Sequence, residues 1–246
     1  MKAERTRGKA FTRFAPRISL VLTGALALMA GSVRGADSPE FVPLFPKGGV
    51  PEGWTVRTWS DVGVPAAAGV HWTVTNGVLQ GSEPRGTWLV SDREYGDFIL
   101  EFEWKLGPRG NSGCGLRFPA KGDPAFDGLE LQMVDPRYFP ADMKVLPEEL
   151  TGGLYRAIAP RGQLFKPEDW NVYHVTCRGG RVTVVLNGTT IQEVNLDEQT
   201  KLPKRHDNTD APPLKDRPRR GHIGFQELSR GGGHVEIRNA RILELK

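Results

Sequence analysis

Three short β-patterned segments within residues 171–196 decide the fold that this sequence predicts. The stretch reads Asn-Val-Tyr-His-Val-Thr-Cys-Arg-Gly-Gly-Arg-Val-Thr-Val-Val-Leu-Asn-Gly-Thr-Thr-Ile-Gln-Glu-Val-Asn-Leu. Apolar and polar residues alternate along it, as they do in half-buried strands, and Gly179-Gly180 and Asn187-Gly188 have the composition of two-residue hairpin turns. We therefore expect strands over residues 171–178, 181–186 and 190–196 that form an antiparallel meander.

The same alternation dominates the chain after residue 70, and long helical periodicity is absent. Asn76-Gly77 predicts the turn of a hairpin within residues 72–80. Short strands separated by Gly, Pro and Asn-Gly turns are typical of an all-β sandwich or jelly roll. Further strands are expected over residues 98–106, 113–118, 128–134, 221–227 and 234–245.

The first 36 residues have the layout of a secretory signal. Six Lys or Arg residues precede residue 18, and a weakly polar to apolar run of 13 residues follows. A membrane-spanning helix needs ~20 apolar residues, which is more than this run provides. We expect cleavage near Gly35 or Ala36 and export to the periplasm or the medium, with an uncleaved N-terminal anchor as the alternative.

This expected signal accounts for the positive charge of the chain. The net charge is +4, but residues 1–36 hold seven of the 33 basic residues and one of the 29 acidic residues, so residues 37–246 carry a net charge of −2. That balance argues against nucleic acid or a membrane as partner after signal removal. The length of residues 37–246 suits a single β domain. Within it, we expect Cys114 and Cys177 to be free core thiols, with a disulfide between them as the alternative.

Period-two alternation divides each expected strand into an apolar face and a polar face. If the strands share a sheet, one polar face gathers Glu103, Arg117, Glu130, Gln132, His222 and Gln226. Glycines at positions 113, 115 and 224 on that face would give a ligand room to approach the backbone. Carboxylate, amide, guanidinium and imidazole groups suit the hydroxyls of a sugar. An ordinary solvated face is the alternative, because the outer face of any sheet in water is polar.

Other catalytic and metal-binding patterns are absent from the sequence. The five His residues lack the spacing of metal ligands, and no serine lies in a nucleophile-elbow motif. Glu101-Phe-Glu103 is similar to the paired carboxylates of glycosidases, but the wider Glu-x-Asp-x-x-Glu pattern is missing.

Two loops are long for a compact β domain. We expect residues 136–167 to be ordered and residues 202–220, with the charge run Arg217-Pro-Arg-Arg220, to be mobile and solvated.

Several motifs occur in order across residues 41–246. Among them are Tyr95-Gly-Asp-Phe-Ile-Leu-Glu-Phe-Glu-Trp104, Asn111-Ser-Gly113, Gly128-Leu-Glu-Leu-Gln132 and Gly221-His-Ile-Gly-Phe-Gln226. Together they resemble the 3-keto-disaccharide hydrolase family, also described as a 3-keto-glucoside lyase and 2-hydroxyglucal hydratase domain. The resemblance implies a concanavalin-like jelly roll of two antiparallel sheets, with a small carbohydrate bound on the concave sheet. Residues 227–233, Glu-Leu-Ser-Arg-Gly-Gly-Gly, depart from the pattern of many relatives and leave substrate choice near them open.

The activity that the resemblance implies is cleavage of 3-keto-glycosides without a metal or an organic cofactor. Elimination across C1 and C2 needs a base for the C2 proton, donors for the enolate oxygen and an acid for the leaving oxygen. The candidates are Glu130 as base, His222 or Glu103 as acid, Arg117, Gln132 and Gln226 as oxyanion donors, and Asn111 and Tyr155 as further substrate-binding residues. A non-catalytic carbohydrate-binding module of the same fold, or an ordinary glycoside hydrolase using Glu103 and Glu130, are the alternatives.

Overall fold

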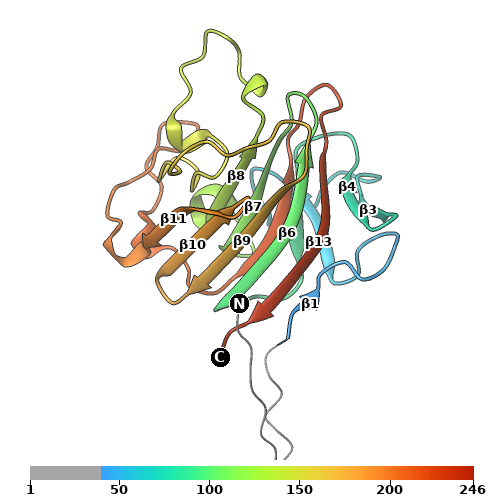
Figure 1. Cartoon of the computed structure of the whole chain (residues 1–246), viewed down its shortest axis with the longest axis horizontal. Coiled ribbons are helices and arrows are strands. Elements are labelled where there is room, and N and C mark those ends of the chain that lie inside the picture. The colour runs from blue at the N-terminus through green and yellow to red at the C-terminus, as the bar shows by residue number, and fades with distance from the viewer. Residues whose placement is uncertain (1–39) are drawn as a thin grey trace, which may run out of the picture. The chain divides into compact units, whose positions relative to one another are not determined.

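The structure is a computed structural model that describes residues 40–246. The expected export signal over residues 1–36 lies outside the described residues. Residues 40–246 form two antiparallel sheets, one of eight strands and one of five (Figure 1). This arrangement confirms the expected all-β jelly-roll sandwich. No helix in this part of the chain has the length and apolar character needed to cross a membrane.

The eight-stranded sheet contains the expected meander and hairpin. Its spatial order is β11-β10-β9-β6-β13-β4-β3, and β1 pairs with β13. Residues 171–195 form three consecutive antiparallel strands in it, and residues 72–81 form the hairpin that turns at Asn76-Gly77. The strands are β1 (Val42–Pro43), β3 (Trp72–Thr75), β4 (Val78–Gly81), β6 (Phe98–Leu106), β9 (Asn171–Arg178), β10 (Arg181–Leu186), β11 (Thr189–Asn195) and β13 (Val235–Glu244).

The five-stranded sheet has the order β2-β5-β12-β7-β8. Two of its strands, β2 and β5, were not among the strands expected from the sequence. Its strands are β2 (Trp54–Thr58), β5 (Thr87–Ser91), β7 (Asn111–Phe118), β8 (Leu129–Val134) and β12 (His222–Glu227). The short helices are α1 (Pro124–Asp127), η1 (Pro136–Tyr138), η2 (Pro147–Glu149), η3 (Leu196–Glu198) and η4 (Leu214–Asp216).

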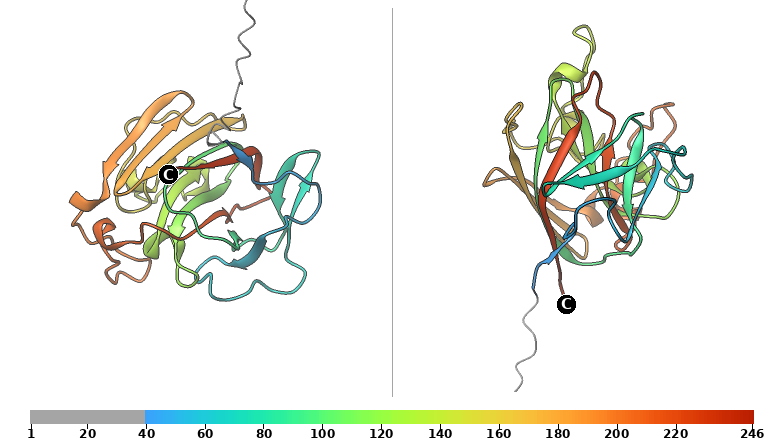
Figure 2. Two further views of the ribbon diagram at one scale, coloured as in Figure 1. Left: turned by 90° about the horizontal axis from the view of Figure 1, so that it is seen from below. Right: turned by 90° about the vertical axis from the view of Figure 1, so that its right-hand side faces the viewer.

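The apolar faces of the two sheets pack against each other and form the main core (Figure 2). Phe102 from β6 meets Phe225 from β12 across the sandwich, with ring centroids 5.2 Å apart. Cys114 and Cys177 are fully buried in this core as free thiols, as expected. Removal of this apolar surface from water is the main force that holds the sheets together.

The connection between β8 and β9 runs along the edge of the five-stranded sheet at β8. Its residues 152–155 pair with β8: Gln132 N donates to Gly153 O at 3.0 Å, and Tyr155 N donates to Glu130 O at 2.9 Å. These bonds satisfy the free edge of β8. They also fix Tyr155 beside Glu130.

The connection between β11 and β12 packs against α1. Arg217 is only 4% exposed, and its guanidinium donates to the carbonyl oxygens of Ala125 and Gly128 at 3.0 and 2.8 Å. Burial lowers the pKa of Arg217 to about 10. The expectation that the charge run is solvated is therefore wrong for Arg217, because backbone carbonyls take the place of water around its side chain.

Candidate active site

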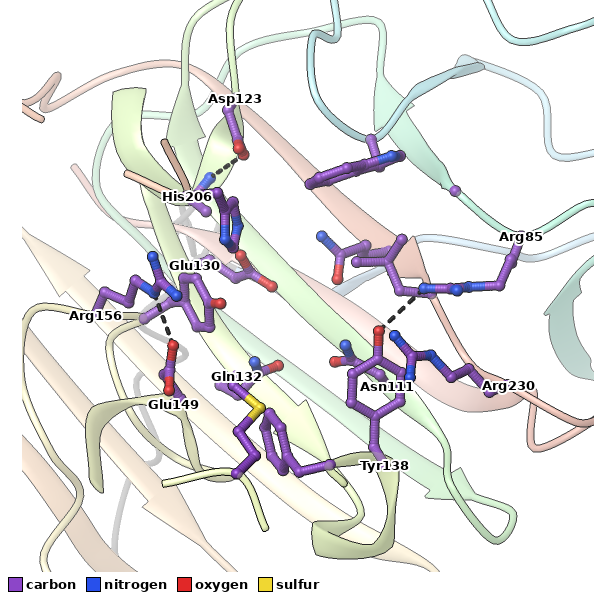
Figure 3. Close-up of a pocket in the computed structure, with 18 of the residues that line it drawn as sticks. Arg85, Asn111, Asp123, Glu130, Gln132, Tyr138, Glu149, Arg156, His206 and Arg230 are labelled. Carbon is purple, nitrogen blue, oxygen red and sulfur yellow. Dashed lines mark hydrogen bonds and ion pairs between the residues drawn. The ribbon is translucent and has the colours of Figure 1, made fainter. Parts of the chain in front are cut away.

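A cavity of about 590 Å³ opens on the outer face of the five-stranded sheet (Figure 3). This volume is in the usual range of small-molecule sites. Strands β7, β8 and β12 supply its floor, and the connections around them supply its walls. The floor residues are Asn111, Glu130, Gln132 and Gln226, and the wall residues include Trp59, Arg85, Asp123, Tyr138, Glu149, Tyr155, Arg156, His206 and Arg230.

Glu130 is a buried carboxyl on the floor of this cavity. It is 3% exposed, and no group within residues 40–246 donates a hydrogen bond to its side chain. Burial raises the pKa of Glu130 well above its ordinary value, and the nearby carboxyl of Asp123 raises it further. Figure 3 shows the Glu130 carboxylate pointing into the cavity below the ring of His206. Glu130 is thus available to a ligand as a strongly basic carboxylate or as a neutral acid.

Asp123 is the second titratable carboxyl of the cavity. It caps α1, and its Oδ1 accepts a hydrogen bond from Ala125 N at 3.0 Å. Burial raises the pKa of Asp123 to about 7, and the charge of Asp127 acts in the same direction. The charge of Asp123 disfavours ionisation of Glu130 because like charges repel. The cavity therefore holds two carboxyls whose pKa values are both raised.

Three amide side chains surround Glu130 on the floor. Gln132 Oε1 accepts a hydrogen bond from Met133 N at 2.9 Å, which leaves the Gln132 NH₂ group for the cavity. Within residues 40–246, the buried oxygens Asn111 Oδ1 and Gln226 Oε1 have no hydrogen-bond partner. Buried polar atoms are normally satisfied. These amides thus offer donors and acceptors that match the hydroxyl groups of a sugar.

Aromatic and charged side chains form the wall of the cavity beside Glu130. The ring of His206 lies edge-on to Phe126 with centroids 5.4 Å apart, and 5.9 Å from that of Tyr155. Burial lowers the pKa of His206, and the charge of Arg156 lowers it further. Arg156 Nε in turn donates to the buried Glu149 Oε1 at 2.7 Å. His206 is thus a neutral imidazole at pH 7, with one N–H donor and one acceptor nitrogen.

The structure brings together some of the sequence-based candidates and separates others. Asn111, Glu130, Gln132, Tyr155 and Gln226 line the cavity. Glu103, Arg117 and His222 do not.

Glu103 lies on β6, which belongs to the eight-stranded sheet, so the assumption that all these strands share a sheet was wrong. Its carboxylate accepts hydrogen bonds from Arg238 Nε at 2.8 Å and Asn239 Nδ2 at 2.7 Å. Partial burial alone would raise the pKa of Glu103, but these donors outweigh burial and lower it. Glu103 and Glu130 therefore do not form a pair of glycosidase carboxylates.

Arg117 points away from the cavity because of a β-bulge. Between β7 and β12 the register shifts, and Arg117 adopts the left-handed conformation with φ of 52°. An extra residue in one strand reverses the alternation of faces beyond it. The fully buried Arg117 instead donates to Gly96 O at 2.7 Å, Gly179 O at 2.7 Å and Asp97 Oδ1 at 2.9 Å. It ties β7 to the connection between β5 and β6 and to the turn between β9 and β10.

The same bulge turns Phe118 onto the outer face of the five-stranded sheet. There it packs with Trp88, at a centroid distance of 6.0 Å, in a small hydrophobic cluster. A Cβ at position 224 would lie 3.1 Å from Phe118 Cζ, so Phe118 covers β12 between Gln226 and His222. His222 Nδ1 lies 2.7 Å from Ser91 O, outside the cavity.

We expected the three glycines of this face to leave room for a ligand. In the structure they leave room for neighbouring side chains instead. A Cβ at position 113 would clash with the Glu130 carboxyl, and a Cβ at position 115 would lie 2.6 Å from Phe118 Cε1. Gly224 likewise lies under Phe118. Gly113 therefore matters for the site because it lets Glu130 lie flat on the floor.

Sequence reasoning missed the wall residues Asp123, Tyr138, Arg156, His206 and Arg230. Asp123 carried a signal, because Asp followed by Pro is a common helix start. The others lie on irregular connections, where no periodicity predicts which way a side chain points. His206 belongs to the loop expected to be mobile and solvated, yet it packs into the wall. The described residues contain no group of three or more His, Cys, Asp or Glu side chains arranged to hold a metal ion.

Residues 40–243 match the 3-keto-alpha-glucoside-1,2-lyase-like domain family. Two crystal structures from Parabacteroides distasonis ATCC 8503, both provisionally named glycosyl hydrolases, are similar to this chain. One is 25% identical with a TM-score of 0.66 and covers 84% of this chain and 100% of that chain. The other is 23% identical with a TM-score of 0.66, covering 84% and 94%. A comparison with curated proteins gave no match.

Proposed function

The chain belongs to the 3-keto-alpha-glucoside-1,2-lyase-like domain family, and we propose that it cleaves 3-keto-glycosides by elimination across C1 and C2. The family and the similar glycosyl hydrolase structures support a carbohydrate-active protein. The observation that carries the finer proposal is the Glu130 carboxyl, buried and without a hydrogen-bond donor among residues 40–246, on the floor of a cavity lined with amides.

The proposed reaction uses the acidity that a ketone at C3 gives to the C2 proton. Removal of that proton leaves an enolate with its charge on the C3 oxygen. The electron pair then forms the C1–C2 double bond and expels the glycosidic oxygen, which takes up a proton. The products are a 2-hydroxy-3-keto-glucal and an alcohol. Addition of water across the double bond completes net hydrolysis.

Glu130 is the base in this proposal. Burial makes the ionised carboxylate a strong base, because its raised pKa increases its affinity for a proton. Asp123 takes the role of acid that Glu103 and His222 were expected to fill. With a pKa of about 7, Asp123 is close to half protonated at neutral pH and can protonate the leaving oxygen. In the active form that we propose, Asp123 is protonated and Glu130 is ionised.

The enolate oxygen needs donors that are in place before charge develops. The NH₂ group of Gln132 and the neutral imidazole of His206 belong to residues that line the cavity, and both can donate to this oxygen. A neutral imidazole donates to a developing oxyanion without giving up its proton. Tyr155, held next to Glu130 by its backbone bond, adds an aromatic surface for the sugar ring.

The test is incubation of purified protein with a 3-keto-disaccharide in D₂O. Mass spectrometry should detect the 2-hydroxy-3-keto-glucal, and NMR should detect loss of the C2 proton. Glu130→Gln keeps the size of the side chain. It should abolish formation of the glucal and loss of the C2 proton, with an unchanged circular dichroism spectrum. Glu193→Gln, an exposed change on β11, is the matched control and should retain full turnover. Retained turnover in Glu130→Gln would refute Glu130 as base.

Two other outcomes would replace the proposal. Equal cleavage of the unoxidised disaccharide would indicate an ordinary glycoside hydrolase, since elimination requires the ketone. Tight binding of the 3-keto-disaccharide with no product and no exchange at C2 would indicate a non-catalytic carbohydrate-binding module.

We also propose that the protein is exported, on the basis of the charged and apolar layout of residues 1–36. Fractionation of cells that express the full chain should recover it from the periplasm or the medium. N-terminal sequencing of that material should begin near residue 36. Recovery only from the cytoplasm would contradict export.

A further inference from the structure

Two arginines converge on Tyr138 at one side of the cavity. Arg85, from the connection between β4 and β5, donates from Nη2 to Tyr138 Oη at 3.0 Å. Arg230, from the connection between β12 and β13, has its Cζ 4.4 Å from the centroid of the same ring. Figure 3 shows Arg85, Tyr138 and Arg230 together on the side of the cavity opposite Arg156. One phenol ring thus holds two guanidinium groups close to each other.

No carboxylate within residues 40–246 forms an ion pair with Arg85 or Arg230. The nearest acidic residue in sequence to Arg85 is Glu83, which is engaged elsewhere. Glu83 Oε2 accepts from the backbone N of Arg85 at 2.9 Å, and Glu83 Oε1 lies 3.3 Å from His234 Nε2. Two like charges beside one ring repel each other, and an anion between them would remove that repulsion.

The opposite side of the cavity has a different balance of charge. Arg156 is the third arginine of the lining, and it is paired with Glu149. Asp123 and Glu130 add two further carboxyls on that side. The cavity is therefore polarised, with titratable acids at the proposed reaction centre and unpaired cations at the other end. A neutral sugar has no charge that could interact with the cations at that end of the cavity.

Arg230 lies in the glycine-rich connection between β12 and β13, and its side chain lines the cavity. Gly231 and Gly232 follow Arg230 with φ of 62° and 81°, a conformation that side chains rarely adopt. The backbone there turns back toward β13, so that Arg230 lies at the cavity and not along the strand. This connection thus adds a cation to the lining.

We propose that the substrate is an acidic saccharide, whose leaving sugar carries an oxyanion bound between Arg85 and Arg230. A carboxylate, as in a glucuronate unit, matches the planar fork of a guanidinium, and a sulfate ester shares this oxyanion chemistry. The inference rests on the proposed function for the orientation of the bound saccharide, with the oxidised sugar at Glu130 and the leaving sugar at the arginines.

Calorimetric titration of the intact protein tests the inference by binding alone. The probes are three unoxidised disaccharides that have glucose at the non-reducing end and glucuronate, glucose 6-sulfate or glucose at the other. We expect at least one of the two anionic probes to bind about tenfold more tightly than the neutral probe, because hydrogen bonds to charged groups are the stronger ones. The stronger of the two identifies the natural oxyanion.

Arg85→Gln and Arg230→Gln should each reduce this preference for the anionic probe, and 0.5 M NaCl should weaken it as well. Arg181→Gln removes one positive charge from an exposed position on β10 and should leave the preference intact. Equal affinities for all three probes in the wild type, or a preference that survives both substitutions, would overturn the inference. Failure of the proposed elimination would show instead as missing product from a 3-keto-disaccharide, which this binding experiment does not measure.

Discussion

Gly113 and Glu130 lie on the adjacent strands β7 and β8, and the Glu130 carboxyl occupies the space that a side chain at position 113 would need. The base of the proposed reaction is therefore positioned by the absence of a Cβ on the neighbouring strand. A close fit of this kind makes the orientation of Glu130 sensitive to the smallest substitution at position 113.

Gly113→Ala should displace the Glu130 carboxyl and lower kcat for a 3-keto-glycoside by about 100-fold, because misplacing a reacting group by about 1 Å has effects of that size. Overpacking should also cost about 1–3 kcal/mol of unfolding free energy. Steady-state kinetics and urea denaturation measure the two effects. Gly48→Ala is the control, because a Cβ there would lie 3.6 Å from Val74 O, an ordinary contact. Unchanged kcat in Gly113→Ala would mean that the position of Glu130 is not critical.

The raised pKa of Asp123 predicts a pH dependence of stability. The folded state holds the Asp123 proton up to a pKa of about 7, compared with 3.8 for the ordinary group. The stabilisation is therefore complete below about pH 4 and is lost as the pH rises through 7. Asp123→Asn removes the titration but keeps an oxygen that can accept from Ala125 N. Between pH 5 and pH 8, the wild type should lose on the order of 3 kcal/mol more unfolding free energy than Asp123→Asn.

Denaturation by urea at a series of pH values measures this difference. Asp207→Asn serves as the control, because hydrogen bonds from Thr209 lower the pKa of this exposed carboxyl and move its contribution below pH 4. Its curve should run parallel to that of the wild type between pH 5 and pH 8. If the Asp123→Asn curve is also parallel, Asp123 does not titrate near neutral pH.

The two cysteines should be inert in the native protein. Cys114 and Cys177 lie on opposite sheets, both fully buried, and burial raises the pKa of each thiol, that of Cys177 to about 12. A thiol reagent added at pH 8 should therefore react with neither in the folded state and with both in urea. Failure to detect any thiol in urea without reductant would show that they form a disulfide in the protein as purified.

Most strand positions and part of the floor of the site followed from the sequence, because alternation with period two records which residues face a core. That pattern alone placed Glu130, Gln132 and Gln226 on one polar face, and the structure has them on the floor of one cavity. Alternation does not record which strands pair with one another. Glu103 has the same local pattern as Glu130, yet it belongs to the other sheet.

Local irregularities of the backbone explain why the positions of the other site residues could not be predicted from the sequence. The bulge at Arg117 reverses the faces at the end of β7, and neither Arg nor its neighbours signals a left-handed residue. His206 and Arg230 reach the cavity from irregular connections, where contacts with distant residues, and not local preference, set the direction of the side chain. The cavity residues on irregular connections are thus the ones that a single sequence reveals least.

We expect the stability of the connection between β11 and β12 to depend strongly on the buried guanidinium of Arg217. Its guanidinium donates to the carbonyl oxygens of Pro212, Ala125 and Gly128. Arg217→Met keeps most of the buried volume but leaves these oxygens without donors. We expect a loss of about 2–4 kcal/mol of unfolding free energy, because unsatisfied buried polar groups are costly.

The loss of stability should be largest near Arg217, because its hydrogen bonds join this connection to α1, the helix that Asp123 caps. Hydrogen exchange should therefore accelerate in residues 124–128 and 203–217 of Arg217→Met more than in the β9–β10 hairpin. Arg220→Gln is the matched control: Arg220 is exposed, its contact with Glu94 is 3.4 Å long, and such surface pairs contribute about 0–1 kcal/mol. Equal stability of Arg217→Met and Arg220→Gln would show that water replaces the lost guanidinium at no cost. Exchange that accelerates uniformly would show that Arg217 supports the whole domain and has no special connection to the site.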